Sequence, residues 1–248
     1  MRPVAPPDWV RAADLGHVIV IVNYLTGGHY TLSGQACDLW RALAATGDAD
    51  TVTLRIDALR IDIVDQMMCR GLLTETPTAH PWLPPPVTSS TASWGTVERD
   101  ACLLRLPPTA RRWRIRGALA LLATLTVRGA GRSGRCLARL LTWLRFATRH
   151  GQAASVEQAL SALNGVRHAS RFFPARVACL EESVAAALTL TLAGYQATWC
   201  HGVAADPIRL HAWIEVKGKR VGEPASTEMF TPIMRIPSSG DDAARRSI

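Results

Sequence analysis

The chain has 248 residues, 48% of them hydrophobic, so it can bury a sizeable core and global disorder is disfavoured. Its formal charge is +8, and all of its 28 lysine and arginine residues except Lys217 and Lys219 are arginines. Six cysteines without a C-x-x-C pair, and an N-terminal stretch without an apolar export signal, predict reduced thiols in a cytoplasmic protein. The most apolar run without arginine, 117–127, is too short to span a bilayer.

Residues 1–76 predict a small winged-helix-like domain. A β-branched run at 17–23, a turn and a second short strand at 29–33 indicate a hairpin. A helix is expected to follow from Ser33 as N-cap to Gly47, and two further amphipathic pieces lead to a stop near Gly71. A hairpin followed by three helices is the outline of a winged helix.

Residues 77–98 are rich in proline, serine and threonine and predict a linker to a second domain, 99–248. Helical segments are expected at 110–128, 133–149 and 155–167. Residues 105–149 hold eleven arginines, in a stretch without any acidic residue. Such a block can bind nucleic acid, an acidic peptide, a membrane surface or a partner protein.

The last hundred residues predict one more helix, from Cys179 to Gly194, followed by a strand at 196–204 and a hairpin that turns at Gly218. The expected fold class is therefore α+β. The winged-helix-like domain comes first, and the second domain packs helices on an antiparallel sheet.

Cys179 stands where an extended segment is expected to become a helix. Backbone N–H groups at a helix N-terminus favour a thiolate over a thiol. Arg176 would add to this effect, whereas Glu181 and Glu182 would oppose it. A thiolate nucleophile also needs an imidazole that forms an ion pair with it and carries protons to the leaving group.

His211 is the candidate imidazole. It opens the run His-Ala-Trp-Ile-Glu-Val, so Trp213 shares its side of a strand, and the turn at Gly218 brings Glu223 back alongside. The order Cys179, His211, Glu223 fits a nucleophile, a base and an orienting acid. The competing interpretation is a core cysteine and a structural histidine. A zinc site made of Cys179, Cys200, His201 and His211 is disfavoured, because their spacing lacks a close ligand pair of the structural-zinc type, and we expect no metal.

Two parts of the chain resemble known families. The run from "ACLEESVAAALTLTLAGY" to "LHAWIEVKGKRVGEP" resembles the transglutaminase-like cysteine peptidase domain of lasso-peptide leader peptidases, the maturation B proteins. The first part, with "VIVIVNYLTGGHYTLSGQACDLWRAL", is similar to the PqqD-like recognition element that binds leader peptides during maturation of ribosomal peptides (RiPPs). Glu223 departs from the family pattern, in which Asp is more frequent.

The resemblance implies a hydrolase of lasso-peptide (antibiotic) biosynthesis that removes a leader peptide. Cys179 would attack the scissile carbonyl, His211 would move the protons, and the core peptide would pass to a separate ATP-using lasso cyclase. No cofactor is expected in this chain, and neither nucleic acid nor a membrane span is expected. The leader would add a strand to the first domain. The expected substrate contacts are Tyr30, Leu32, Val64, Met67, Arg176 and Trp213.

Two other functions remain open at this point. The same cysteine scaffold can transfer the acyl group to an amine, as transglutaminases do, instead of to water. Alternatively the chain is a binding module without catalysis, in which the arginine block holds DNA or a protein.

Overall fold

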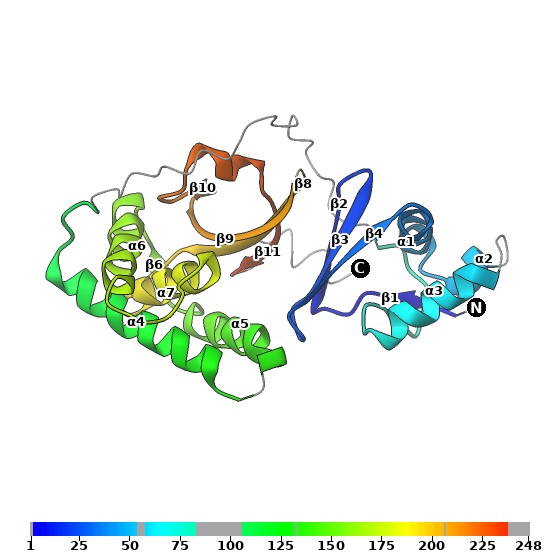
Figure 1. The fold of residues 1–248 in the computed structure, drawn as a ribbon, viewed down its shortest axis with the longest axis horizontal. Coiled ribbons are helices and arrows are strands. Elements are labelled where there is room, and N and C mark those ends of the chain that lie inside the picture. Colours follow the sequence, from blue (N-terminus) through cyan, green and yellow to red (C-terminus); the bar gives the residue numbers. More distant parts are fainter. Residues whose placement is uncertain (1, 54–57, 83–105, 132, 206, 238–248) are drawn as a thin grey trace. The chain divides into compact units, whose positions relative to one another are not determined.

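The computed structural model describes five segments of the chain: residues 2–53, 58–82, 106–131, 133–205 and 207–237. They belong to two compact units, one within residues 1–89 and one within residues 90–247 (Figure 1). The predicted linker, 77–98, lies outside the described residues from residue 83 onward.

The first unit is built on a three-stranded antiparallel sheet with the order β2-β3-β4. The predicted hairpin is present as β3 (Val18–Asn23) and β4 (Gly28–Ser33), whereas β2 (Val10–Asp14) was not expected. Two short strands, β1 (Val4–Ala5) and β5 (Thr74–Glu75), form a separate antiparallel pair. Within the described residues β4 pairs only with β3, which leaves its other edge open for pairing.

The described residues of the first unit also form three helices: α1 (Gln35–Thr46), α2 (Ala49–Thr53) and α3 (Ala58–Cys69). Helix α1 ends at Gly47 as predicted, with a left-handed backbone whose N–H donates to the Leu43 carbonyl. Its N-cap is Gly34 and not Ser33, because β4 runs on through Ser33 and the backbone at Gly34 needs a positive φ of 53°. The hairpin and helices agree with the expected outline, and the likeness to a winged helix stays a prediction.

The first unit continues beyond the expected boundary at residue 76. The Trp82 indole N–H donates to the Val4 carbonyl at 3.1 Å, and its ring packs edge-on against Trp40 at 4.9 Å between centroids. The backbone at His80 lies so close to Gly47 that a Cβ there would approach it within 2.6 Å. Residues 80–82 are therefore part of the packed unit and not a free linker.

The second unit contains a layer of helices: α4 (Arg111–Gly129), α5 (Cys136–Ala147), α6 (Val156–Ser170) and α7 (Cys179–Thr191). A 3-10 turn, η1 (Ser133–Arg135), precedes α5. All four helices lie close to their predicted ranges. Helices α4 and α6 touch through Gly117 and Gly165, where a Cβ on Gly117 would meet the Gly165 carbonyl carbon at 2.6 Å. Helix α7, made largely of alanine and leucine, is buried along most of its length.

The sheet of the second unit is antiparallel with the order β10-β9-β8-β11. Strands β8 (Thr198–Ala205), β9 (Ile208–Val216) and β10 (Lys219–Arg220) follow the prediction, and β11 (Thr231–Ile236) was not expected. Both central residues of the β9–β10 turn, Lys217 and Gly218, have positive φ, as a two-residue hairpin turn requires. A 3-10 turn, η2 (Ala225–Met229), precedes β11, and β6 (Gln152–Ala153) pairs in parallel with β7 (Tyr195–Gln196).

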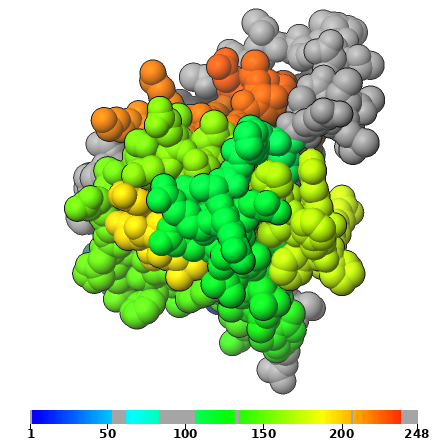
Figure 2. Space-filling model, turned by 90° about the vertical axis from the view of Figure 1, so that its left-hand side faces the viewer, coloured from blue at the N-terminus to red at the C-terminus, as the bar shows by residue number. Residues whose placement is uncertain are grey.

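Helix α4 has one exposed side (Figure 2, green). Ile115, Leu119 and Leu122 each expose about half of their surface there, and Arg111 and Arg112 are exposed at its N-terminal end. The opposite side of α4 packs into the unit. No helix among the described residues is both long and apolar enough to cross a membrane.

Candidate active site

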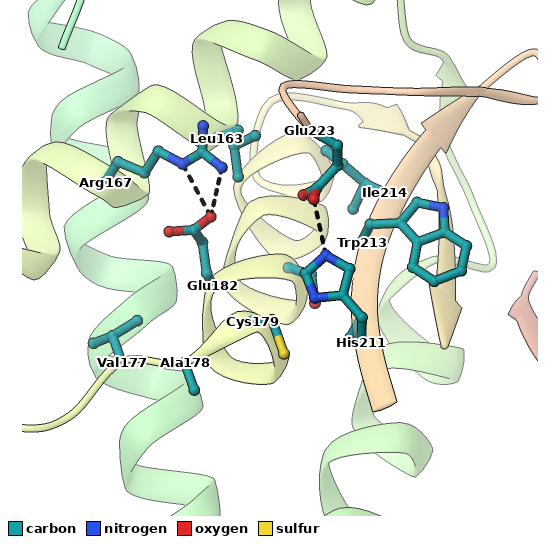
Figure 3. Close-up of a pocket in the computed structure, with 12 residues that line it drawn as sticks. Leu163, Arg167, Val177, Ala178, Cys179, Glu182, His211, Trp213, Ile214 and Glu223 are labelled. Carbon is teal, nitrogen blue, oxygen red and sulfur yellow. Dashed lines mark hydrogen bonds and ion pairs between the residues drawn. The ribbon is translucent and has the colours of Figure 1, made fainter. Parts of the chain in front are cut away.

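Helix α7 and strand β9 bring Cys179 and His211 together. Cys179 is the first residue of α7 and is partly buried, and His211 lies on β9 with its imidazole between Cys179 and Glu223 (Figure 3). The thiol and the imidazole lie close enough for each to shift the pKa of the other. This places a nucleophile at a helix N-terminus in contact with a base.

Glu223 approaches His211 from the segment after β10. The Nε2–H of His211 donates to Oε2 of Glu223 at 2.8 Å, which leaves Nδ1 of the ring for the thiol. Gly222 makes this approach possible, because its φ is +66° and a Cβ there would meet Leu163 Cδ2 at 2.5 Å. The predicted contact between His211 and Glu223 is therefore present.

The environment stabilises the charged forms of both Cys179 and His211. Burial raises the pKa of the Cys179 thiol, but the hydrogen bond to His211 and nearby backbone N–H groups outweigh burial, so this pKa is lowered. Burial lowers the pKa of His211, yet the hydrogen bonds with Cys179 and Glu223 raise it from 6.5 to about 9. Between these two pKa values the stable form is a thiolate beside an imidazolium.

Two ion pairs hold the acidic residues of the first turn of α7. Glu181 pairs with Arg128 at 2.8 Å, and its other oxygen accepts the Ala178 backbone N–H. Glu182 pairs with Arg167 at 2.9 Å (Figure 3). Because each carboxylate has an arginine partner, their expected opposition to a thiolate is reduced. Sequence reasoning missed both arginines, because they lie on other helices, α4 and α6, that come before α7 in the chain.

A pocket of about 190 Å³ lies beside the Cys179–His211 pair. Its apolar wall includes Leu163, Val177 and Ile214, and Arg167 and Glu182 stand on the opposite side from Glu223 (Figure 3). A small cleft of this kind, next to a nucleophile and a base, can hold part of an acyl substrate.

Trp213 and Phe230 pack against the His211 ring. The Trp213 ring is fully buried and stacks with His211 at 5.9 Å between centroids, and its indole N–H donates to Glu215 at 2.9 Å. Phe230, from the segment after η2, packs against the same imidazole at 5.1 Å. The Trp213 side chain is buried against the histidine although the residue lines the pocket, and its substrate contact stays a prediction.

The expected peptide contacts in the first unit divide into two groups. Tyr30 and Leu32 lie on β4, partly exposed, beside its open edge. Val64 and Met67 are buried, at 1% and 3% exposure, in the core between α3 and the sheet. Met67 is therefore a core residue and not a surface contact, and the neighbouring Met68 is more exposed.

Arg176 is exposed just before α7, and its carbonyl oxygen accepts a hydrogen bond from Arg128. Its role in substrate binding stays a prediction.

Cys200 and His201 differ in character from the Cys179–His211 pair: burial raises the pKa of Cys200 and lowers the pKa of His201 to about 4. His201 stacks on Trp199, and its lowered pKa favours the neutral imidazole.

Comparison with known families agrees with this geometry. Residues 122–235 match the family model of the transglutaminase-like superfamily. These residues form a transglutaminase-like domain. The match begins within α4, ends in β11 and contains all three residues of the Cys179, His211 and Glu223 cluster. Searches of curated proteins and of solved structures returned no significant match.

Transglutaminase-like domains typically have a cysteine-protease-like catalytic fold, used by peptidases and by acyltransferases. The Cys179 helix packed on the β8–β9 sheet, with His211 on β9, fits that description. The match does not extend to the first unit, so the PqqD-like element stays a prediction.

Proposed function

We propose that the protein is a cysteine peptidase that cleaves the leader from a ribosomally made lasso-peptide precursor. The observation that carries this proposal is the His211 imidazole placed between Cys179, at the start of α7, and Glu223 at 2.8 Å. The resemblance of both sequence halves to leader peptidases supplies the substrate class. A cytoplasmic location and an ATP-using cyclase as partner belong to the same proposal.

The proposed reaction proceeds through a thioester. The Cys179 thiolate attacks the scissile carbonyl carbon, and the backbone N–H of Cys179 stabilises the oxyanion. The C–N bond then breaks while the His211 imidazolium gives its proton to the departing amine of the core peptide. Water, deprotonated by His211, attacks the thioester, so the leader leaves with a free carboxylate and the thiolate returns. Glu223 holds the imidazole throughout.

Leader binding is proposed for the first unit. The edge of β4 that is open within the described residues offers backbone N–H and C=O groups to an added peptide strand, and Tyr30 and Leu32 lie beside it. Peptides that dock in this way gain affinity from main-chain hydrogen bonds and specificity from alternate side chains. The arginine-rich α4 is a proposed docking surface for the precursor or the cyclase.

The cleavage experiment uses the cognate precursor peptide and mass spectrometry. Wild type is expected to release a leader with a free carboxylate and an intact core peptide, and Cys179→Ala is expected to release neither. Cys136→Ala is the matched control, because Cys136 is also a partly exposed first residue of a helix. Cleavage by Cys179→Ala at the wild-type rate would refute the proposal.

Acyl transfer to an amine is the alternative that the same domain family also includes. The same experiment separates the two reactions, because transfer leaves an amide in place of the carboxylate when an amine is added. The binding-module alternative predicts a salt-sensitive DNA shift that is lost when the exposed arginines of α4 are neutralised. The absence of any shift at low salt would exclude DNA binding by these arginines.

A further inference from the structure

The carboxylate of Glu223 has a second partner besides His211. The Thr227 hydroxyl donates to Oε2 of Glu223 at 3.1 Å, and this is the same oxygen that accepts His211 Nε2–H. Both groups are well enclosed, since the Glu223 side chain is 10% exposed and Thr227 is 3% exposed. A hydrogen bond to a buried carboxylate is stronger than one in water and strongly directional.

A glutamate needs such a partner more than an aspartate would. Its side chain has one more rotatable bond, so holding the carboxylate in a single orientation costs more conformational entropy. Threonine is suited to holding it, because a β-branched side chain is restricted at χ1 and its hydroxyl therefore points in a defined direction. We propose that Thr227 is a positioning residue whose hydroxyl fixes the Glu223 carboxylate in the orientation that holds His211. The inference rests on the proposed catalytic role of the Cys179–His211 pair.

Thr227 is itself tied to the sheet. It lies in η2, where its N–H donates to the Pro224 carbonyl at 2.9 Å. The Arg220 guanidinium donates to the Thr227 carbonyl and to the Phe230 carbonyl, and it lies over the Trp213 ring at 4.6 Å. Because Trp213 stacks with His211, the groups that support the acid and the groups that support the base belong to one network.

This arrangement predicts how the loss of the Thr227 hydroxyl would change the reactivity of Cys179. Without the Thr227 donor, Glu223 gains alternative orientations and its hydrogen bond to His211 weakens. The imidazolium is then less favoured, and the Cys179 thiolate loses its partner. The reaction of Cys179 with an alkylating agent at low pH therefore reports on Thr227 without any peptide substrate.

The test compares Thr227→Val with Thr227→Ser. Valine keeps the shape and removes the donor, whereas serine keeps the donor and removes a methyl group. Iodoacetamide alkylation of Cys179 is followed by mass spectrometry from about pH 5 to 9 in each variant. We expect the rate at about pH 6 to fall about tenfold in Thr227→Val and to stay within about twofold of wild type in Thr227→Ser.

Thr124→Val is the matched control. Thr124 is likewise a buried threonine of the second unit, but its hydroxyl donates to the Ala120 carbonyl within α4. Its substitution is expected to leave the alkylation profile unchanged. If valine disturbs the η2 turn, which circular dichroism and thermal unfolding would reveal, Thr227→Ala removes the same donor and is interpreted in the same way.

Peptide cleavage gives a second readout. Thr227 contacts Glu223 but does not itself line the pocket, so Thr227→Val is expected to lower kcat with little change in KM. The variant Glu223→Gln distinguishes a failure of the positioning role of Thr227 from a failure of the proposed function. If Glu223→Gln loses the low-pH reactivity of Cys179 while Thr227→Val keeps the wild-type profile, the positioning role is refuted and the proposed function stands. If wild-type Cys179 reacts no faster than Cys136, the thiolate–imidazole pair itself is refuted.

Discussion

At the scale of single residues, the charge state of Cys179 is the property that the site controls most directly. The lowered pKa of the thiol and the raised pKa of His211, about 9, define a pH window in which the ion pair exists. Thiolate appears as the pH rises through the lowered pKa of Cys179. The imidazolium, which must protonate the leaving amine, is lost as the pH rises through about 9.

We therefore expect a bell-shaped pH dependence of the acylation rate. Its alkaline limb is expected near pH 9 and its acidic limb below the pKa of an ordinary thiol. In His211→Ala the low-pH alkylation of Cys179 should disappear, because burial then raises the thiol pKa without an opposing imidazolium. Competitive labelling of all six cysteines measures this. A Cys179 rate in His211→Ala equal to wild type at about pH 6 would contradict the ion pair.

The members of the cluster were predictable from the sequence because each has a local signal. Cys179 stands at a helix start, His211 opens an alternating strand, and Gly218 marks the turn that returns Glu223. Thr227 and Arg167 carry no such signal. Thr227 matters because a 3-10 turn places it against Glu223, and Arg167 because α6 packs against α7.

At the scale of elements, the helices were predictable, whereas β2 and β11 of the two larger sheets and the two-residue strands β1, β5 and β6 were not. Strand β2 contains arginine and alanine between its apolar residues, so its alternation is weak. Strand β11 contains Pro232, which ordinarily argues against a strand. The structure accommodates this proline because β11 is an edge strand and its register against β8 shifts between Pro232 and Met234.

The α4–α6 crossing predicts a stability effect at Gly117. A Cβ at this position would meet Gly165 backbone atoms at 2.6 to 2.8 Å, and helix backbones cannot move apart without opening the core. Gly117→Ala is expected to destabilise the second unit by about 1–3 kcal/mol, although alanine is the better helix former. Urea unfolding followed by tryptophan fluorescence measures the change.

Gly129→Ala is the control within the same helix. A Cβ at Gly129 meets nothing within 4 Å, so we expect this variant to keep the wild-type stability or to exceed it slightly. Equal effects of the two substitutions would show that the close approach at Gly117 contributes nothing to stability.

At the scale of the whole molecule, the proposed function divides the work between the two units. The second unit carries the transglutaminase-like domain and the cysteine cluster, and the proposed peptide-binding edge is on β4 of the first unit. Sequence patterns anticipated this division because the proline-rich segment separates two stretches of different character. The predicted linker begins too early, at residue 77, because Trp82 still packs into the first unit. Its contacts with Val4 and Trp40 link residues far apart in the chain and leave no local signal in the sequence.

This division predicts where a leader peptide protects the backbone from hydrogen exchange. An added strand on β4 would occupy its outward N–H groups, so amides of Gly28–Ser33 should exchange more slowly when leader is present. Strand β2, the other edge of the same sheet, serves as an internal control and should keep its exchange rates. Cys179→Ala should show the same protection, because binding does not require the thiol. Protection of β2 in place of β4 would place the peptide on the opposite edge, away from Tyr30 and Leu32.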